Sequence, residues 1–342
     1  MKRLLSAFLF VLLLTAGVLA AAVWVWFDRT VAPQTAATEI VIPAGSSARS
    51  IGKLLEEAGL DVSEDGFALA TRLLRVSHRL QAGVYAIPAG SSFLAVVRQV
   101  SQGDALQEPI TLIEGWTFAQ ILAALHNHPQ IRATLPPEPQ KAAALLAQEL
   151  GYPGSAIEGW IYPDTYLFHR GQTDMSILTR AFRLQQRVLE EAWAKRSPAI
   201  ALKTPQEALA LASIIEKETQ HGPDRPRVSA VFHNRLARGM RLQSDPTTIY
   251  GLGPRFDGNL RRDDLQDDSP YNTYRWAGLP PSPIANPGRQ AILAAVNPAP
   301  LQALYFVAQG NGRSYFSETL DRHNWAVNYF QRRIGPPPPD GV

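Results

Sequence analysis

The sequence contains no cysteine in its 342 residues, so disulfide bonds and thiolate metal sites are excluded. Its histidines form no His-Glu-x-x-His motif, because His126 and His128 are two positions apart instead of four. A glycine-rich loop followed by Lys-Ser/Thr is also missing, as is a Gly-x-Ser-x-Gly elbow. These absences argue against a zinc enzyme, a nucleotide-binding enzyme and an esterase, and we expect no metal and no cofactor.

The sequence also has little excess of either sign of charge. The formal net charge is +3, and no long run of Lys or Arg occurs. Proteins that bind nucleic acid usually carry a basic stripe or patch, so we expect no nucleic-acid partner. The length allows two or three domains with a sizeable core.

One long hydrophobic run is present. Residues 4–27 carry no charged side chain and follow Lys2 and Arg3. About 20 apolar residues suffice to cross a bilayer, so we predict a cytoplasmic stub at 1–3 and a transmembrane anchor at 4–27. The alternative is a signal peptide cleaved at the small residues 20–22, although the apolar run continues beyond them. Three aromatic side chains end the run, where interfacial aromatics are expected: Trp24, Trp26 and Phe27.

An internal repeat follows a linker at 28–38. The segment Ile-Pro-Ala-Gly-Ser-Ser occurs at 42–47 and again at 87–92, each time between a short β-like run and an amphipathic helix. Pro-x-Gly favours a turn and Ser favours a helix N-cap. The pattern in 39–107 resembles LysM-like domains, which bind glycans containing N-acetylglucosamine. A structural spacer is the alternative.

We predict an α+β fold: the anchor, the LysM-like α+β subdomain, a mixed α/β catalytic domain at 108–334, and a disordered tail at 335–342. Near the end of the catalytic domain, 304–308 reads as a strand, and Tyr315 and Phe316 begin its hairpin partner across a glycine-rich turn.

A helix over 204–219 carries the strongest chemical signal. Thr204 is a predicted N-cap, Pro205 suits the first helical position, and Glu207 can reach back to complete a capping box. At 100° per residue, Glu218 falls on the same narrow face as the apolar side chains at 211, 214 and 215, whereas Glu216 points nearly the opposite way.

A carboxylate among apolar neighbours has a raised pKa, and a carboxylic acid that is neutral near pH 7 can protonate a leaving group. Glu218 is therefore the candidate general acid. The alternative is that Glu218 pairs with an Arg or caps a loop.

Polar and aromatic clusters supply further candidates. They occupy 157–166, 240–251 and 269–274, and a proline-rigidified loop follows at 278–288. Aromatic faces stack on sugar rings and carboxylates accept hydroxyl protons, so such loops suit a sugar cleft, although the loop at 157–166 can equally plug a core. The candidate orienting or substrate-binding residues are Glu158, Asp164, Gln243, Asp245, Tyr271, Asn272 and Tyr274.

Seven segments together resemble one family, the membrane-anchored endolytic murein transglycosylases (MltG or YceG-like). The segments are EGWIYPDTY at 158–166, LASIIEKET at 211–219, VFHNRLARGMRLQSDPTTIYG at 231–251, SPYNTY at 269–274, GLPPSPIANPG at 278–288, AVNP at 295–298 and TLDRHN at 319–324. The family's catalytic glutamate matches Glu218. The family usually has a His in a Gly-Gly-His-x-Phe setting, where this chain has Ser314, so the role of that position is in doubt.

The resemblance implies a lytic cleavage of the β-1,4 bond between N-acetylmuramic acid and N-acetylglucosamine in nascent peptidoglycan. It also implies an inner-membrane protein with a periplasmic catalytic domain, a 1,6-anhydro-muramyl product, termination of strand growth, and peptidoglycan synthases such as penicillin-binding proteins as partners. Glu218 would act alone, because the muramyl 6-hydroxyl is the nucleophile.

Two other readings compete with the lytic enzyme. The first is a hydrolase that uses Asp164 or Asp245 as nucleophile or base, since most glycosidases pair two carboxylates. The second is a non-catalytic glycan-binding scaffold.

Overall fold

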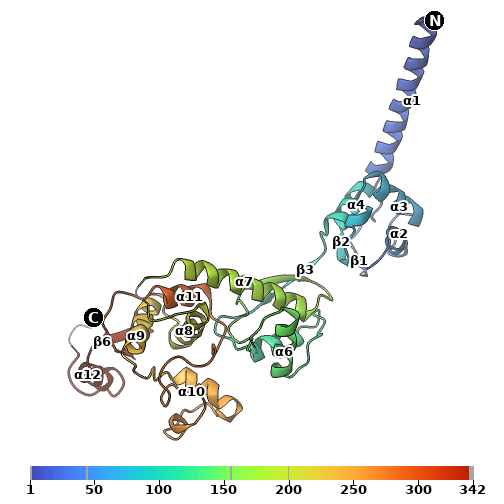
Figure 1. Ribbon diagram of the computed structural model, residues 1–342. Coiled ribbons are helices and arrows are strands. Elements are labelled where there is room, and N and C mark those ends of the chain that lie inside the picture. Colours follow the sequence, from blue (N-terminus) through green and yellow to red (C-terminus); the bar gives the residue numbers. More distant parts are fainter. Residues whose placement is uncertain (1, 44, 155, 199, 339–342) are drawn as a thin grey trace. The chain divides into compact units, whose positions relative to one another are not determined.

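The computed structural model describes residues 2–43, 45–154, 156–198 and 200–338, and for residues 2–5 it describes the backbone only. The chain divides into two compact units. The first contains residues 1–109 and 167–171, and the second contains residues 110–166 and 172–342. The fold is a mixed α+β arrangement, as predicted, with small sheets and many helices (Figure 1). The proposed disordered tail lies partly outside the described residues, which end at 338, and the cytoplasmic stub begins with residue 1, which is also outside them.

The first unit begins with α1 (Lys2–Asp28), drawn in blue in Figure 1. Its stretch Ser6–Asp28 is long and apolar enough to cross a membrane, and most of its side chains are exposed. The end of α1 differs from the prediction of an interfacial aromatic belt. Phe27 is 8% exposed and, with Trp26, packs against Phe93 in the core of the unit, whereas Trp24 is exposed. The last turn of α1 is thus part of a folded module.

The rest of this unit follows the order β1 (Thr38–Ile42), α2 (Ala48–Glu57), α3 (Glu64–Leu73), β2 (Gly83–Ile87) and α4 (Phe93–Gln102). β1 and β2 are antiparallel, with Thr38 opposite Ile87 and Ile42 opposite Gly83. The sequence analysis did not predict α3. The LysM-like assignment of 39–107 remains a prediction.

The internal repeat has a shared geometry. Ser47 and Ser92 are the N-caps of α2 and α4, and their hydroxyls accept the backbone N–H of Ser50 and Ala95. The preceding serines also act alike, because Ser46 and Ser91 donate to the carbonyls of Pro43 and Pro88 at 2.8 and 2.7 Å. Gly45 and Gly90 have φ of 80° and 71°, which the turn needs and other residues adopt at a cost. The repeated sequence therefore encodes a repeated turn-and-cap.

The strand pair β3 (Gln107–Thr111) and β4 (Thr165–His169) contains residues of both units. In the second unit, α5 (Phe118–His126), α6 (Pro139–Glu149) and α7 (Asp174–Ala194) precede α8 (Pro205–Glu218). After α8 come α9 (Arg225–Ala237), α10 (Asp245–Leu252) and α11 (Arg289–Val296). The chain then forms an antiparallel hairpin of β5 (Tyr305–Ala308) and β6 (Ser314–Ser317), as predicted, and α12 (Leu320–Phe330), which the sequence analysis missed.

The core of the second unit surrounds α8, which packs against α7, α9, α10 and α11 (Figure 1). All residues from 208 to 216 are buried, so the helix is covered on every side. The sequence emphasised one apolar stripe, but a helix apolar nearly all round belongs in a core. Thr204 caps the helix as predicted, while Glu207 reaches back to the N–H of Lys203 rather than that of Thr204. This buried helix holds its last residue, Glu218, in a fixed place.

Candidate active site

Glu218 ends α8 beside the start of α10. The Ser244 hydroxyl donates to Glu218 Oε1 at 2.5 Å, and in the described part of the chain Oε2 makes no hydrogen bond. Burial and, to a smaller extent, the negative charge of Asp245 raise the pKa of Glu218, the Ser244 hydroxyl and the Arg235 guanidinium oppose the rise, and the net pKa is about 7. The carboxyl group is therefore close to half protonated at neutral pH.

A cavity of about 380 Å³ opens at Glu218. It lies between the turn that follows α8 and the β5–β6 hairpin, and its lining consists of Glu218, Thr219, Gln220, His221, Ala308, Gly312, Arg313 and Ser314. An acid that is neutral near pH 7 and has a free oxygen beside a cavity can donate a proton to a bound group.

Glu216, two residues earlier, has a different environment. Its Oε1 accepts from Arg225 at 2.7 Å, and its Oε2 accepts the N–H of Gly288 at 2.9 Å. Its side chain is 5% exposed, so both oxygens are occupied by protein groups in the core. Glu216 thus has the structural ion pair that was the alternative reading for Glu218. The two carboxylates of the Glu-Lys-Glu segment therefore differ in their hydrogen-bond partners.

Three predicted residues lie around Glu218. Asp245 is the first residue of α10, exposed, and its Oδ1 accepts the Tyr274 hydroxyl at 2.6 Å. Burial and the charges of Asp245 and Glu218 raise the pKa of Tyr274, so its hydroxyl stays protonated. Gln243 is exposed and has φ of 51°, and its side-chain oxygen lies 3.5 Å from Arg235 Nη1. The start of α10 therefore brings polar groups to the acid.

The sequence analysis missed two residues of this group. Ser244, which contacts Glu218 directly, lies between the named residues Gln243 and Asp245, and its small hydroxyl was the available signal. Arg235 is 7% exposed and donates to the carbonyls of Leu304 and Leu242, which joins the residue before β5 to the segment before α10. Its position carried no clear signal, because α9 contains Arg225 and Arg227 as well.

Tyr271 and Asn272 lie elsewhere. The Tyr271 hydroxyl is 2.7 Å from the Ser282 hydroxyl, and its ring packs edge-on against Tyr250. Asn272 is fully buried, its amide donates to the carbonyls of Leu265 and Asp267, and its oxygen accepts from Thr248 and Tyr274. Both polar atoms of the Asn272 amide are therefore engaged by protein groups.

Glu158 is the second buried acid. Its Oε1 accepts from the Phe118 N–H at 2.9 Å and from Asn286 at 3.0 Å, and Tyr250 donates to Oε2 at 3.3 Å. Burial raises its pKa to about 7, against the effect of these hydrogen bonds. Glu158 lines a cavity of about 1030 Å³ that also includes Lys217, Ile249, Tyr250 and Tyr271. Since both of its oxygens join separate chain segments, Glu158 has the contacts of a structural residue.

Asp164 is exposed just before β4, and its Oδ1 accepts the N–H of Thr165 at 2.7 Å. In the described part of the chain, no hydrogen bond or ion pair joins Asp164 to Glu218. The structure thus gathers Gln243, Asp245 and Tyr274 near Glu218, and gives Asp164, Tyr271, Asn272 and Glu158 other neighbours.

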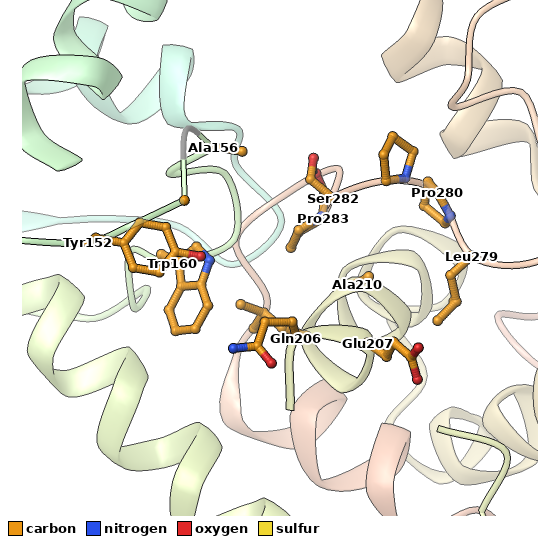
Figure 2. Close-up of a pocket in the computed structure, with 13 residues that line it drawn as sticks. Tyr152, Ala156, Trp160, Gln206, Glu207, Ala210, Leu279, Pro280, Ser282 and Pro283 are labelled. Atoms are coloured by element: carbon orange, nitrogen blue, oxygen red, sulfur yellow. The ribbon is translucent and has the colours of Figure 1, made fainter. Parts of the chain in front are cut away.

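A smaller cavity, of about 310 Å³, lies near the other end of α8 (Figure 2). Gln206 and Glu207 of α8, the proline loop at 279–283, Tyr152 and Trp160 line it. Trp160 is 6% exposed and packs against Tyr152 and Phe182, so it plugs the core as the alternative reading proposed. Glu207 and Glu218 are eleven residues apart, roughly 16 Å along a helix, so this cavity is separate from the acid.

The described residues contain no group of three or more His, Cys, Asp or Glu side chains placed to hold an ion.

Comparison with known proteins places this geometry in a family. Residues 40–329 match the YceG-like family. The chain is 32% identical over 304 residues to the endolytic murein transglycosylase of Bacillus subtilis, covering 84% of this chain and 83% of that protein. It is 29% identical over 315 residues to the endolytic murein transglycosylase of Streptococcus pneumoniae, covering 83% of this chain and 56% of that protein. A crystal structure of a YceG-like protein from Listeria monocytogenes has a TM-score of 0.54 and 29% identity, covering 84% of this chain and 98% of that one. The chain therefore belongs to the YceG-like family.

Proposed function

We propose that this protein is an endolytic murein transglycosylase that cleaves the β-1,4 bond between N-acetylmuramic acid and N-acetylglucosamine, with Glu218 as its general acid and base. The observation that carries the proposal is the state of Glu218: an acid with a pKa of about 7, one free oxygen, and a cavity beside it. The Bacillus subtilis and Streptococcus pneumoniae relatives are endolytic murein transglycosylases, which supports the same reaction class.

The proposed reaction uses one carboxyl group twice. Neutral Glu218 donates its proton to the glycosidic oxygen as the C1–O bond breaks, and the N-acetylglucosamine side leaves with a hydroxyl. The resulting carboxylate, stabilised by the Ser244 hydroxyl and the positive charge of Arg235, takes the proton of the muramyl 6-hydroxyl. The O6–C1 bond forms, giving a 1,6-anhydro-muramyl end, and the acid is regenerated. No water is consumed, so no second carboxylate is required.

We further propose that α1 is retained as an anchor and that both units lie outside the cytoplasm, where peptidoglycan is found. The continuous helix through residue 28 and the burial of Phe27 in the first unit support a retained anchor over a cleaved signal peptide. Cleavage by a membrane-anchored enzyme would act on nascent strands and terminate their elongation, which fits synthases as partners.

Substitution of Glu218 tests the mechanism. E218Q keeps the shape of the side chain and removes the acid, so the release of anhydro-muropeptides by the purified full-length chain should fall about 10²- to 10⁴-fold. E190Q, at an exposed position of α7, is the matched control and should keep the wild-type rate. A near wild-type rate for E218Q would rule out the assignment.

A hydrolase is the second candidate, because Asp245 is close enough for its charge to raise the pKa of Glu218. In that reaction Asp245 would activate a water, and the product would be a reducing end. Mass spectrometry separates the two, since the anhydro product lacks one water. Reducing ends as the main product would replace the lytic mechanism with the hydrolytic one, and no product from the wild type would favour a binding scaffold.

A further inference from the structure

The Glu218 cavity contains two basic side chains that the proposed mechanism does not use. His221 comes from the turn after α8, and Arg313 comes from the turn between β5 and β6, so they reach the cavity from two parts of the chain. Ser314 lines the cavity beside Arg313.

One buried carboxylate, that of Asp224, connects the two sides. Asp224 is 3% exposed, and its Oδ2 lies 3.4 Å from His221 Nδ1. The same Oδ2 accepts the backbone N–H of Ser314 at 2.7 Å. The His221 backbone is also held, because its N–H donates to the Thr219 hydroxyl at 3.1 Å and its carbonyl accepts the Asp224 N–H at 3.0 Å. The position of the imidazole relative to the hairpin is thus set by Asp224.

The imidazole itself is available to a ligand. Its side chain is 30% exposed and lines the cavity, while its buried Nδ1 faces the Asp224 carboxylate, so a ligand can reach only the exposed part of the ring. Arg313 is exposed, whereas Asp224 is buried and is not part of the cavity lining. Arg313 is the one permanent positive charge among the described lining residues, and the one acid among them, Glu218, is partly neutral at its pKa of about 7. Such a surface favours an anion.

We propose that His221 and Arg313 form an anion-binding edge of the Glu218 cavity, and that this edge binds a carboxylate carried by the muramyl residue of the substrate. The proposal rests on the proposed function. N-acetylmuramic acid differs from N-acetylglucosamine by its lactyl ether, whose carboxylate is free in stripped strands and is otherwise amide-linked to a peptide stem that carries carboxylates of its own. An anion-binding edge next to the acid would therefore select the muramyl sugar for the position where the C1–O bond breaks.

Binding to the inactive full-length chain tests the proposal. Three glycans of equal length are compared on E218Q: strands with peptide stems, strands stripped by an amidase so that the lactyl carboxylate is free, and chito-oligosaccharides, which lack the carboxylate. Adding H221N should weaken binding of a muramyl glycan about 10-fold and leave chito-oligosaccharide binding unchanged. Adding R313Q should act in the same direction. H78N, at an exposed histidine of the first unit, is the control and should change neither.

The pattern identifies the source of the carboxylate. A loss confined to stripped strands indicates the lactyl carboxylate, and a loss confined to peptide-bearing strands indicates the stem. Equal weakening for all three glycans, or no change, would overturn the proposal, because a merely structural imidazole does not discriminate between sugars. The wild-type chain is assayed for anhydro products on the same strands. Absence of those products would refute the proposed function, whereas products together with an unchanged H221N preference would refute only the anion-binding edge.

Discussion

Glu218 has neighbours that move its pKa in opposite directions, and this makes the acid testable at the residue scale. Ser244 donates to the carboxylate and favours the charged form, while the charge of Asp245 favours the neutral form. With a pKa of about 7, Glu218 loses its proton as the pH rises through neutrality. We therefore expect kcat/KM to fall above about pH 7, measured by release of anhydro-muropeptides from pH 5 to 9.

Two variants should shift this pH dependence in opposite directions. S244A removes the hydrogen bond to the charged form, so the pKa of Glu218 rises and the alkaline limb moves up by about one pH unit. D245N removes a negative charge, so the pKa falls and the limb moves down. The Ser244 side chain caps no helix in the described chain, so S244A should fold normally. A shift of the alkaline limb in the same direction for S244A and D245N would contradict the assignment.

The raised pKa of Glu218 should also make the stability of the fold depend on pH. The pKa of Glu218 rises from 4.5 to about 7 on folding, so its neutral form favours the folded state at low pH, and this contribution is lost as the pH rises through 7. E218Q escapes the cost of a buried charge. At pH 8 it should be more stable than the wild type by about 1–3 kcal/mol, and the difference should shrink toward pH 5. Chemical denaturation at the two pH values checks this.

E216Q is the opposing control on the same helix. It should destabilise the chain by about 3 kcal/mol, because an uncharged amide cannot accept from both Arg225 and the Gly288 N–H in the core. Equal stability effects from E216Q and E218Q would mean that the two carboxylates do not have the different environments described above.

At the scale of elements, sequence patterns predicted most helices and strands but not their surroundings. Thr204, Ser47 and Ser92 are caps that local sequence specifies, and β2 begins and ends at the predicted residues. The helix α10 was read as a polar loop because its first turn, Asp-Pro-Thr-Thr, lacks an apolar period. It forms nevertheless, since Thr247 and Thr248 are buried and hydrogen-bonded to loop residues that come later in the chain.

The candidate site divides in the same way. Glu218 could be selected by helical geometry, because its position on α8 depends only on residue spacing. The polarity of Asn272 and Glu158 could not show that they lie among other neighbours than Glu218, since their hydrogen-bond partners are in distant segments of the chain. Phe27 was assigned to the membrane interface for a similar reason: its partner Phe93 is 66 positions away and no local pattern joins them.

The end of α1 should therefore contribute to folding. F27A should destabilise the first unit by about 3 kcal/mol, because a buried ring that packs against Phe93 is removed. F8A, on the exposed part of the same helix, should leave the unit unchanged. Hydrogen exchange of β1 and α4 measures the effect without requiring the second unit to unfold. Equal protection in both variants would place Phe27 in the membrane interface after all.

At the scale of the whole molecule, the chain combines an apolar helix with two compact units, of which the second contains Glu218. The proposed function requires the second unit to lie on the side of the membrane where murein is found. The positive residues before the apolar run predict that side, since Lys and Arg are retained in the cytoplasm.

The absence of cysteine makes the orientation directly measurable, because each introduced thiol is the only one in the chain. K141C, exposed on α6, should react with a membrane-impermeant maleimide in intact spheroplasts. K2C should react only after the membrane is permeabilised, and the wild type should not react at all. Labelling of K2C on the full-length polypeptide would also exclude removal of a signal peptide, because cleavage at 20–22 would separate the label from the folded units. Protection of K141C in intact spheroplasts would place the second unit in the cytoplasm, away from murein, and the proposed function would fail with it.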